Sequence, residues 1–350
     1  MKDVLAVDFL DQPDKFGLVE ACKQLYLLGA LDADGEITTQ GRQMAKIPVE
    51  PALGRVLLAA AAAGDILGDV VTIVAMLGSE EGGGVWIRPT GDVSKRREAD
   101  LARAHFARDK LGDQIALLRL YDDWHRAGKN SRWCTERWVH GRSLSRAGAL
   151  RDLLLNALPA QALDRGRGGA SSGNFDHKTL ERIRIALCYG LYMRAAERNR
   201  NGGYYTLGEQ RALVLLHPSS SVLPVHGTND DDYSDDEGGG DYEQPKIDVD
   251  ALPPFVLYQE IVATSEKFMR QVVAVEEAWI RPMLRKIDTI DPKRLMGGRP
   301  LPMEALAPGR SRAAGAGGAP ADGKRRNDDV SVASAKERYL ARKAAAAKNK

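Results

Sequence analysis

Residues 25–51 read LYLLGALDADGEITTQGRQMAKIPVEP, and this stretch decides how the chain begins to fold. A helix that begins near Pro13, a residue favoured in the first turn, is predicted to end at Gly29, since glycine commonly terminates helices. Asp34-Gly35 favours a tight turn between two short extended segments, and a short helix is expected over residues 39–46. These elements predict a small winged-helix-like unit over residues 1–51.

The segment from residue 52 to residue 158 is expected to be almost entirely helical, and a Gly/Ser-rich loop at 164–173 precedes one further helix of the 52–198 region. Apolar residues recur there at helical spacing, and the connections are short and contain Gly or Pro. The pattern predicts a helical bundle. Its aromatic residues Tyr121, Trp124, Trp133 and Trp138 are expected in the core. The predicted helices cover residues 52–63, 67–77, 98–111, 114–127, 132–141, 143–158 and 178–198.

Beyond residue 198 the pattern changes to short runs rich in Val, Ile and Tyr. Runs at 203–207, 212–217, 254–263 and 269–275 predict the strands of a small β-barrel over residues 199–290. An insertion at 228–245 holds eight acidic residues and no basic ones, and is predicted to be disordered. The predicted fold class is therefore mainly α with a small β-barrel.

Residues 291–350 are predicted to form a basic disordered tail. From residue 293 onward there are 14 Lys and Arg against 5 Asp and Glu, a net charge of +9 within a whole chain of only +2. Cys22, Cys134 and Cys188 form no CxxC pair, which predicts free thiols in a reducing compartment. The apolar runs are far shorter than a membrane span of about 20 residues requires. A nuclear or cytoplasmic protein is expected.

Catalytic motifs are mostly missing from the sequence. It contains no HExxH, no GxSxG and no GxGxxG that opens a βαβ unit. The nearest phosphate-loop pattern, Gly318 to Lys324, is followed by Arg325 where Ser or Thr would be required. Histidine spacings do not fit a zinc site. We therefore expect no catalytic residue, no cofactor and no metal in this chain.

Binding is the remaining function. Residues 88–151 contain 15 Arg and Lys against 8 Asp and Glu, a local net charge of +7. A basic surface of this size can neutralise several phosphates. It could equally be the solvated face of a helical bundle. The adjacent predicted barrel favours nucleic acid, because small five-stranded barrels commonly bind single strands.

Short motifs follow one another along most of the chain: residues 8–13 (DFLDQP), 25–32, 39–45, 47–51, 88–89, 112–113, 142–144, 217–222 (HPSSSV), 256–262 (VLYQEIV) and 278–280. This colinear series resembles the C-terminal region of the DEAH-box ATP-dependent RNA helicases. The resemblance covers roughly residues 6–290. The chain departs from the family at Gln114, where a His usually follows Gly-Asp, and at an extra serine in the HPSS string.

The resemblance implies the order winged helix, ratchet bundle and oligonucleotide-binding barrel, together with a channel for single-stranded RNA. It also implies two preceding RecA-like motor domains, which would bind ATP and Mg²⁺ and which this sequence lacks. We expect a truncated sequence rather than a natural motor-less protein. Expected partners are single-stranded RNA, the motor domains in cis and a glycine-rich activator protein, without a membrane. The nucleus is the expected location.

The same resemblance suggests which residues contact RNA. Arg142 and Ser143 would do so near the start of a bundle helix, by a phosphate pair and a hydroxyl hydrogen bond. A loop containing His217, Ser219 and Ser220 would offer amides and hydroxyls to the backbone. Lys267 and Arg270 would add phosphate contacts. Each of these has a structural alternative: a salt bridge at Arg142, a self-stabilised serine turn and solvated strand-edge charges.

Two other function classes remain open at this stage. The bundle could be a non-enzymatic scaffold that binds proteins, with the acidic insertion and the basic tail recruiting partners. A DNA-binding winged helix is a weaker alternative, because its recognition helix would carry only Arg42 and Lys46 as basic residues. Salt-dependent RNA binding that weakens in Arg142→Ala would favour the RNA channel over the scaffold.

Overall fold

The computed structural model describes residues 14–79, 84–159, 175–208, 211–223, 248–264 and 266–297. Residues 22–300 belong to one compact unit. Of the second unit the structure describes residues 14–21, in which α1 begins at Lys15. None of the helices in the described ranges is long and apolar enough to cross a bilayer. The acidic insertion at 228–245 and residues 298–350 of the basic tail lie outside the described residues.

The predicted winged-helix-like unit over residues 1–51 is described from residue 14 onward. Helix α1 (Lys15–Leu27) is followed by Gly29, whose φ of 76° is a left-handed conformation that glycine adopts freely. Leu31 and Ile37 pair as an isolated bridge around the Asp34-Gly35 turn, and α2 (Thr39–Met44) follows. Thr38 caps this helix, since its Oγ1 accepts from the Gly41 N–H at 2.9 Å.

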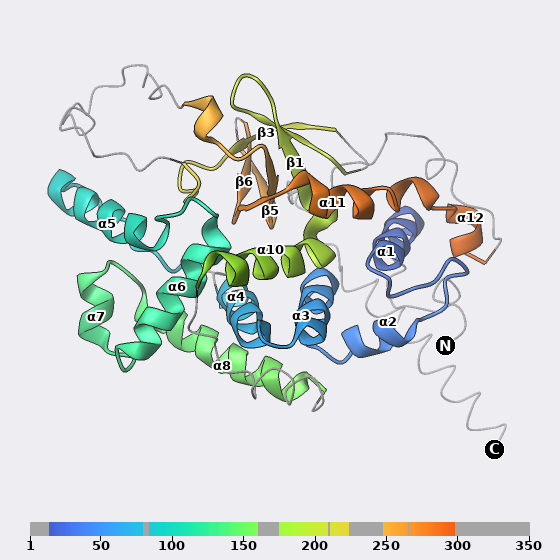
Figure 1. Ribbon diagram of the computed structural model, residues 1–350, viewed down its shortest axis with the longest axis horizontal. Helices are drawn as coiled ribbons and strands as arrows, with labels where there is room; N and C mark the ends of the chain where they lie inside the picture. The colour runs from blue at the N-terminus through green and yellow to red at the C-terminus, as the bar shows by residue number, and fades with distance from the viewer. Residues whose placement is uncertain are drawn as a thin grey trace, which may run out of the picture. The chain divides into compact units, whose positions relative to one another are not determined.

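The helical bundle is built around α4, in which every residue except Gly78 is buried and most side chains are aliphatic. α3 and α4 pack together, α10 lies across α3, and α8 and α6 pack against α4 (Figure 1). Trp124 and Tyr121 are buried, as predicted, while Trp133 and Trp138 are only partly buried. The bundle helices are α3 (Pro51–Ala63), α4 (Leu67–Ser79), α5 (Val93–Phe106), α6 (Asp113–Arg126), α7 (Ser131–Glu136), α8 (Gly141–Ala157) and α10 (His177–Leu191).

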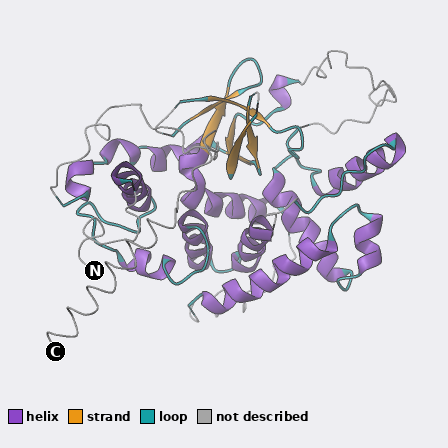
Figure 2. Ribbon diagram, turned by 180° about the vertical axis from the view of Figure 1, so that it is seen from behind, coloured by secondary structure: helices purple, strands orange, loops and turns teal. Residues whose placement is uncertain are grey.

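The strands form one seven-stranded mixed sheet on the side of α10 away from α3 and α4 (Figure 1 and Figure 2). Its order is β5-β6-β3-β2-β1-β4-β7, with β3 and β6 parallel and all other neighbours antiparallel. The strands are β1 (Ala195–Arg198), β2 (Tyr204–Thr206), β3 (Leu213–Leu216), β4 (Phe255–Leu257), β5 (Glu260–Ala263), β6 (Lys267–Arg270) and β7 (Val273–Val275).

The predicted barrel needs a correction, because the sheet is not closed. Only Tyr258 and Gln259 separate β4 from β5, yet these strands lie near opposite ends of the order, so the sheet must curl strongly. The returning chain bends at Gln271, whose φ of 53° is unusual for a non-glycine residue. Within the described ranges β5 and β7, at the two ends, do not pair with each other.

Several boundaries also differ from those expected. The helices predicted over 98–111 and 132–141 are α5 and α7, at Val93–Phe106 and Ser131–Glu136. The helix predicted over 178–198 ends at Leu191, and residues 195–198 form β1, because Ala195 and Ala196 are buried in the sheet. Residues 292–295, predicted as disordered, form α12 (Pro292–Leu295) after α11 (Glu277–Leu284). Leu295 is buried beside Gly35 of the wing, which holds α12 in place.

Short 3-10 helices complete the described part of the chain. They lie at Tyr192–Arg194, Val249–Ala251 and Ile287–Thr289. The segment after α11 is tied to the winged-helix unit by Lys286, whose Nζ donates to the carbonyl oxygens of Tyr26 at 2.7 Å and Leu27 at 3.1 Å. A lysine placed there also complements the negative end of the α1 dipole.

Candidate nucleic-acid interface

The parallel pair β3 and β6 brings two predicted site residues to one edge of the sheet. Parallel strands end on the same side, so His217, which follows β3, lies near Arg270, the last residue of β6. The His217 N–H donates to the Met269 carbonyl at 3.0 Å, which extends the pairing by one step. The turn that follows, residues 217–220, therefore projects from the C-terminal ends of both strands.

This turn is held in shape by its own side chains. His217 Nδ1 accepts from the Ser219 N–H at 3.1 Å and lies 2.7 Å from Ser219 Oγ. Since Nδ1 accepts from an amide, the neutral ring carries its proton on Nε2 and the Ser219 hydroxyl donates to Nδ1. Burial, followed by the positive charges of Arg270 and Arg103, lowers the pKa of His217. The neutral imidazole is thus the form that fits the turn.

One buried carboxylate joins this turn to the helical bundle. Asp113, the first residue of α6, accepts from the Ser221 N–H at 2.7 Å, the Val272 N–H at 2.9 Å and the Ser220 hydroxyl at 3.2 Å. It is only 8% exposed. The three donors come from two separate loops of the sheet, so Asp113 fixes both of them to the start of α6.

Gly112 makes this close approach of backbones possible. It pairs with Val273 as an isolated bridge, and its φ of 123° favours glycine. A Cβ atom added there would lie 2.3 Å from the Val272 carbonyl oxygen. We refer to the contacts of Gly112 and Asp113 with residues 220–221 and 272–273 as the junction.

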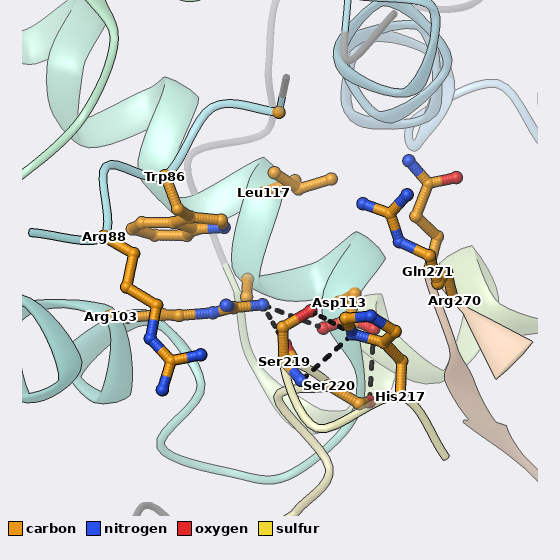
Figure 3. Close-up of a pocket in the computed structure, with 12 residues that line it drawn as sticks. Trp86, Arg88, Arg103, Asp113, Leu117, His217, Ser219, Ser220, Arg270 and Gln271 are labelled. Atoms are coloured by element: carbon orange, nitrogen blue, oxygen red, sulfur yellow. Dashed lines mark hydrogen bonds and ion pairs between the residues drawn. The ribbon is translucent and has the colours of Figure 1, made fainter. Parts of the chain in front are cut away.

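A cavity of about 170 Å³ opens beside the junction. Figure 3 shows Trp86, Arg88 and Arg103 grouped on one side and His217, Arg270 and Gln271 on the other. Its lining therefore combines the α4–α5 connection, α5, the start of α6 and two loops of the sheet. The complete lining is Gly84, Trp86, Arg88, Arg103, Asp113, Ala116, Leu117, His217, Ser219, Ser220, Arg270 and Gln271.

The charge of the cavity is dominated by three arginines. Arg103 lies over the Trp86 ring at 5.4 Å, donates to the Ser219 carbonyl and pairs with Asp113 at 3.8 Å. Arg270 is partly exposed and shares its charge with Glu260 at 3.1 Å. Arg88 is exposed and has no ion pair or hydrogen bond with any residue that the structure describes. Such a site is suited to a phosphate group.

Four of the predicted site residues meet at this cavity: His217, Ser219, Ser220 and Arg270. Ser143 lies just behind it, because the Ser143 hydroxyl donates to the carbonyl oxygen of Gly84, a lining residue, at 3.4 Å. Ser143 is itself buried. The start of α8 therefore contacts one of the segments that line the cavity.

The other two predicted residues lie away from the cavity wall. Arg142 is exposed at the start of α8 and does not line the cavity, and none of the described residues forms a salt bridge with it. Lys267 lies at the opposite end of β6 from Arg270. Because alternate strand residues point to opposite faces, its side chain follows that of Met269 rather than that of Arg270.

Trp86, Arg88, Arg103 and Asp113 were not among the predicted site residues. Arg88 and Gly112-Asp113 do belong to the motifs that carry the helicase resemblance, and Arg103 contributes to the basic excess of residues 88–151. These signals mark the region but not the residues. Which basic side chains turn toward the cavity depends on how α5 and the sheet pack at the junction.

Three known family models match successive parts of the chain. Residues 21–49 match the winged-helix part of the helicase associated domain (HA2). Residues 50–117 match the ratchet-like part of that domain, and residues 183–287 match an oligonucleotide/oligosaccharide-binding (OB) fold. The chain contains the C-terminal module of the DEAH-box helicases.

In this helicase module the cavity lies at a boundary between matched domains. Arg88, Arg103 and Asp113 belong to the ratchet-like match, whereas His217 and Arg270 belong to the OB-fold match. The candidate site is therefore built by two domains of the module together. Among the described residues no cluster of His, Cys, Asp or Glu is arranged to hold a metal ion.

Proposed function

We propose that this helicase module holds a single strand of RNA at the junction cavity. The observation that carries the proposal is the convergence of Arg88, Arg103 and Arg270 from three separate segments around one polar turn (Figure 3). An OB fold contributes half of the site, which favours an oligonucleotide over a protein ligand. The amides and hydroxyls of the turn suit contacts with phosphate and ribose, which carry no sequence information.

The three arginines would have different roles in RNA binding. Arg88, which is exposed, can pair with a phosphate without giving up a protein contact. Arg270 would exchange Glu260 for phosphate, and Arg103 is held by Trp86 and Asp113, so it presents a preorganised charge. Arg142 and Ser143, next to Gly84, would extend the contact along the start of α8. Lys267 would meet RNA only beyond the cavity.

The wider function is proposed by analogy with the family. RecA-like domains that bind ATP and Mg²⁺ would drive the strand through the module, and this part would hold the strand between steps. A glycine-rich activator is a further proposed partner, and the nucleus is the proposed location. The module alone is expected to bind RNA weakly and to leave ATP intact.

The test is binding of a fluorescent single-stranded RNA to the full chain at several salt concentrations. Arg88→Ala is expected to weaken binding and to reduce the slope of log K against log salt by about one, as the loss of one phosphate contact requires. Arg270→Ala should act in the same direction. Arg132→Ala is the matched control, because this arginine on α7 is exposed and lies outside the cavity lining.

Two results would overturn the proposal. Absence of RNA binding by the wild-type chain at low salt would favour the protein-binding scaffold instead. Equal weakening by Arg88→Ala and Arg132→Ala would show that RNA responds to overall charge rather than to this cavity.

A further inference from the structure

The chain bends sharply between β6 and β7, and two residues at the start of α6 hold this bend in place. The bend lies at Gln271, whose φ of 53° is left-handed. Asp113 accepts from the Val272 N–H at 2.9 Å, and its own N–H donates to the Val272 carbonyl at 2.6 Å. The side-chain Nε2 of Gln114 donates to the Gln271 carbonyl. The start of α6 therefore contacts three neighbouring backbone groups of the bend.

This bend decides which side chains of β6 face the cavity. Met269 and Val272, three residues apart, are both completely buried in the apolar core of the sheet. The two residues between them, Arg270 and Gln271, both line the cavity, and Figure 3 shows their side chains on the same side. Alternate residues of a straight strand share a face. If the bend were straightened while Asp113 still held Val272, Arg270 would therefore point toward the core.

The left-handed conformation of Gln271 has a free-energy cost that Gln114 offsets. This region of backbone conformation is unfavourable for a residue that has a Cβ atom. A hydrogen bond to a backbone carbonyl contributes a stabilisation of similar size. The Gln114 amide therefore stabilises the bend at the residue where the backbone itself opposes it.

The stability of the core alone does not explain a glutamine at position 114. Gln114 is the second residue of α6 and is completely buried. Its Nε2 is bonded to the bend, but its Oε1 is buried and accepts no hydrogen bond from the described residues. A buried acceptor without a partner destabilises a fold, and an apolar side chain of the same length would avoid this cost. The bend gives the better explanation of this residue.

We propose that Gln114 is a positioning residue for RNA binding, which holds the bend at Gln271 so that Arg270 faces the junction cavity. Gln114 does not itself line the cavity, so it acts through Arg270 and not by touching RNA. Arg88 belongs to the α4–α5 connection, outside the bend, and does not depend on Gln114. The inference rests on the proposed RNA function and specifies what aims one of its three arginines.

The experiment is a double-mutant cycle on the full chain, with binding of a fluorescent single-stranded RNA as the readout. Gln114→Met keeps the length of the side chain and removes the amide donor. We expect Arg270→Ala to weaken RNA binding about ten-fold, and Gln114→Met about five-fold because it misplaces the same guanidinium. The variant with both changes should lose about ten-fold rather than the product of about fifty-fold, since both act on one contact.

Three further variants sharpen the cycle. The effect of Arg88→Ala should multiply with that of Gln114→Met, as for independent sites. Gln114→His should bind RNA like the wild type, since an imidazole Nε2–H reaches about as far as the amide and can donate to the same carbonyl. Gln114→Asn, whose amide is one methylene too short for this contact, should lose as much affinity as Gln114→Met.

Gln40→Met is the matched control. The Nε2 of Gln40 donates to the Leu28 carbonyl at 2.8 Å, next to Gly29, whose φ of 76° is also left-handed. The substitution therefore removes the same kind of hydrogen bond in the winged-helix unit, outside the cavity lining. It should leave RNA binding unchanged. Circular dichroism verifies that each variant folds.

The results separate this inference from the proposed function. If Arg270→Ala weakens RNA binding and Gln114→Met does not, Gln114 has no positioning role while the cavity still binds RNA. Effects of Gln114→Met and Arg270→Ala that multiply, or a Gln114→His variant as weak as Gln114→Met, would also overturn the inference. If Arg88→Ala and Arg270→Ala both bind RNA like the wild type, the proposed function fails, and the role of Gln114 fails with it.

Discussion

Helix α4 and the start of α6 are both buried, but they are stabilised in opposite ways. α4 buries mostly its own aliphatic side chains, such as Val70 and Ile73 at 0% exposure, together with polar residues such as Asp69 and Thr72. At the start of α6 the buried group is instead a carboxylate, that of Asp113, which accepts hydrogen bonds from two backbone amides and a hydroxyl. The stability of the first region therefore comes mainly from buried apolar area, and that of the second from hydrogen bonds to one buried charge.

The difference separates what holds the module together from what forms its site. Apolar packing is non-directional and tolerates volume-conserving exchange. A buried polar junction is directional, so the loss of one member leaves others unsatisfied. The cavity that we propose for RNA lies beside the junction and not beside α4. Changes in α4 should therefore affect stability alone, while changes at the junction should affect both stability and RNA binding.

The largest expected effect is that of Gly112→Ala. The new Cβ would lie 2.3 Å from the Val272 carbonyl oxygen, and φ at this position is 123°. Because the backbones on both sides are fixed, we expect a loss on the order of 4 kcal/mol in the free energy of unfolding. Urea denaturation followed by circular dichroism measures it.

Gly128→Ala is the control for this substitution, at the other end of the same helix. Gly128 also has a positive φ, 72°, but a Cβ there would have no described atom within 4 Å. Only the backbone preference is lost, so we expect about 1 kcal/mol. Equal losses in the two variants would show that the junction yields easily and does not position the cavity.

The second effect is that of Leu57→Ala in the bundle. Leu57 on α3 is completely buried in the main apolar core. Removal of its side chain should cost about 3 kcal/mol through lost transfer free energy and a residual cavity. The folded variant should bind RNA like the wild type. A large loss of RNA affinity at a temperature where the variant is folded would show that the core and the cavity are coupled.

The contrast between the two regions also explains which features could be predicted from the sequence. Helical spacing of apolar residues located α3, α4 and α6 closely, since an apolar stripe is a local signal. The turn at Asp34-Gly35 was likewise predicted from a local signal, the two residues themselves. Residues 195–198 were assigned to the preceding helix, because the two alanines carry no strand signal until β2 and β4 pair with them.

The barrel was predicted too simply for a related reason. Residues 254–263 contain β4 and β5, and residues 269–275 contain the end of β6 and all of β7. The chain bends between β6 and β7 at Gln271, and a glutamine in the sequence does not predict a positive φ. At the site, the motif residues 217–220 were found from the family resemblance. Arg103 and Asp113 became candidates only when folding placed them beside that turn, more than a hundred residues away in sequence.

A third effect is expected from Asp113→Asn. Asparagine has the same shape, but its amide group would face one of the N–H donors that Asp113 now accepts. We expect the free energy of unfolding to fall by about 2 kcal/mol, as for a hydrogen bond to a buried charged group. RNA binding should also weaken, because Arg103 and the turn lose their shared anchor.

Glu136→Gln is the matched change at a carboxylate outside the junction. Glu136 is exposed and pairs with Arg132 along α7, and such a pair contributes at most about 0.5 kcal/mol. We expect its RNA binding to be unchanged. An Asp113→Asn variant that is as stable as Glu136→Gln would contradict the view that the junction depends on its polar partners.

The smallest effect concerns pH and His217. Burial and the charges of Arg270 and Arg103 lower the pKa of His217 in the folded state, whereas the unfolded chain has a histidine pKa of about 6.5. Below pH 6.5 the unfolded chain therefore binds more protons than the folded chain, which lowers the stability of the fold. The contribution of the neutral His217 to the free energy of unfolding is complete above pH 6.5. It is lost as the pH falls through the lowered pKa of His217 in the folded state.

His217→Asn separates this effect from the other titrating groups. The Asn Oδ1 can take the place of Nδ1 as acceptor for the Ser219 N–H, but it does not titrate. We expect the thermal midpoint to fall less between pH 7.5 and pH 5.5 in the variant than in the wild type, with similar midpoints at pH 7.5. An identical decline in both proteins would show that a charged imidazole is tolerated beside Arg103 and Arg270. The junction would then depend less on electrostatics than its geometry indicates.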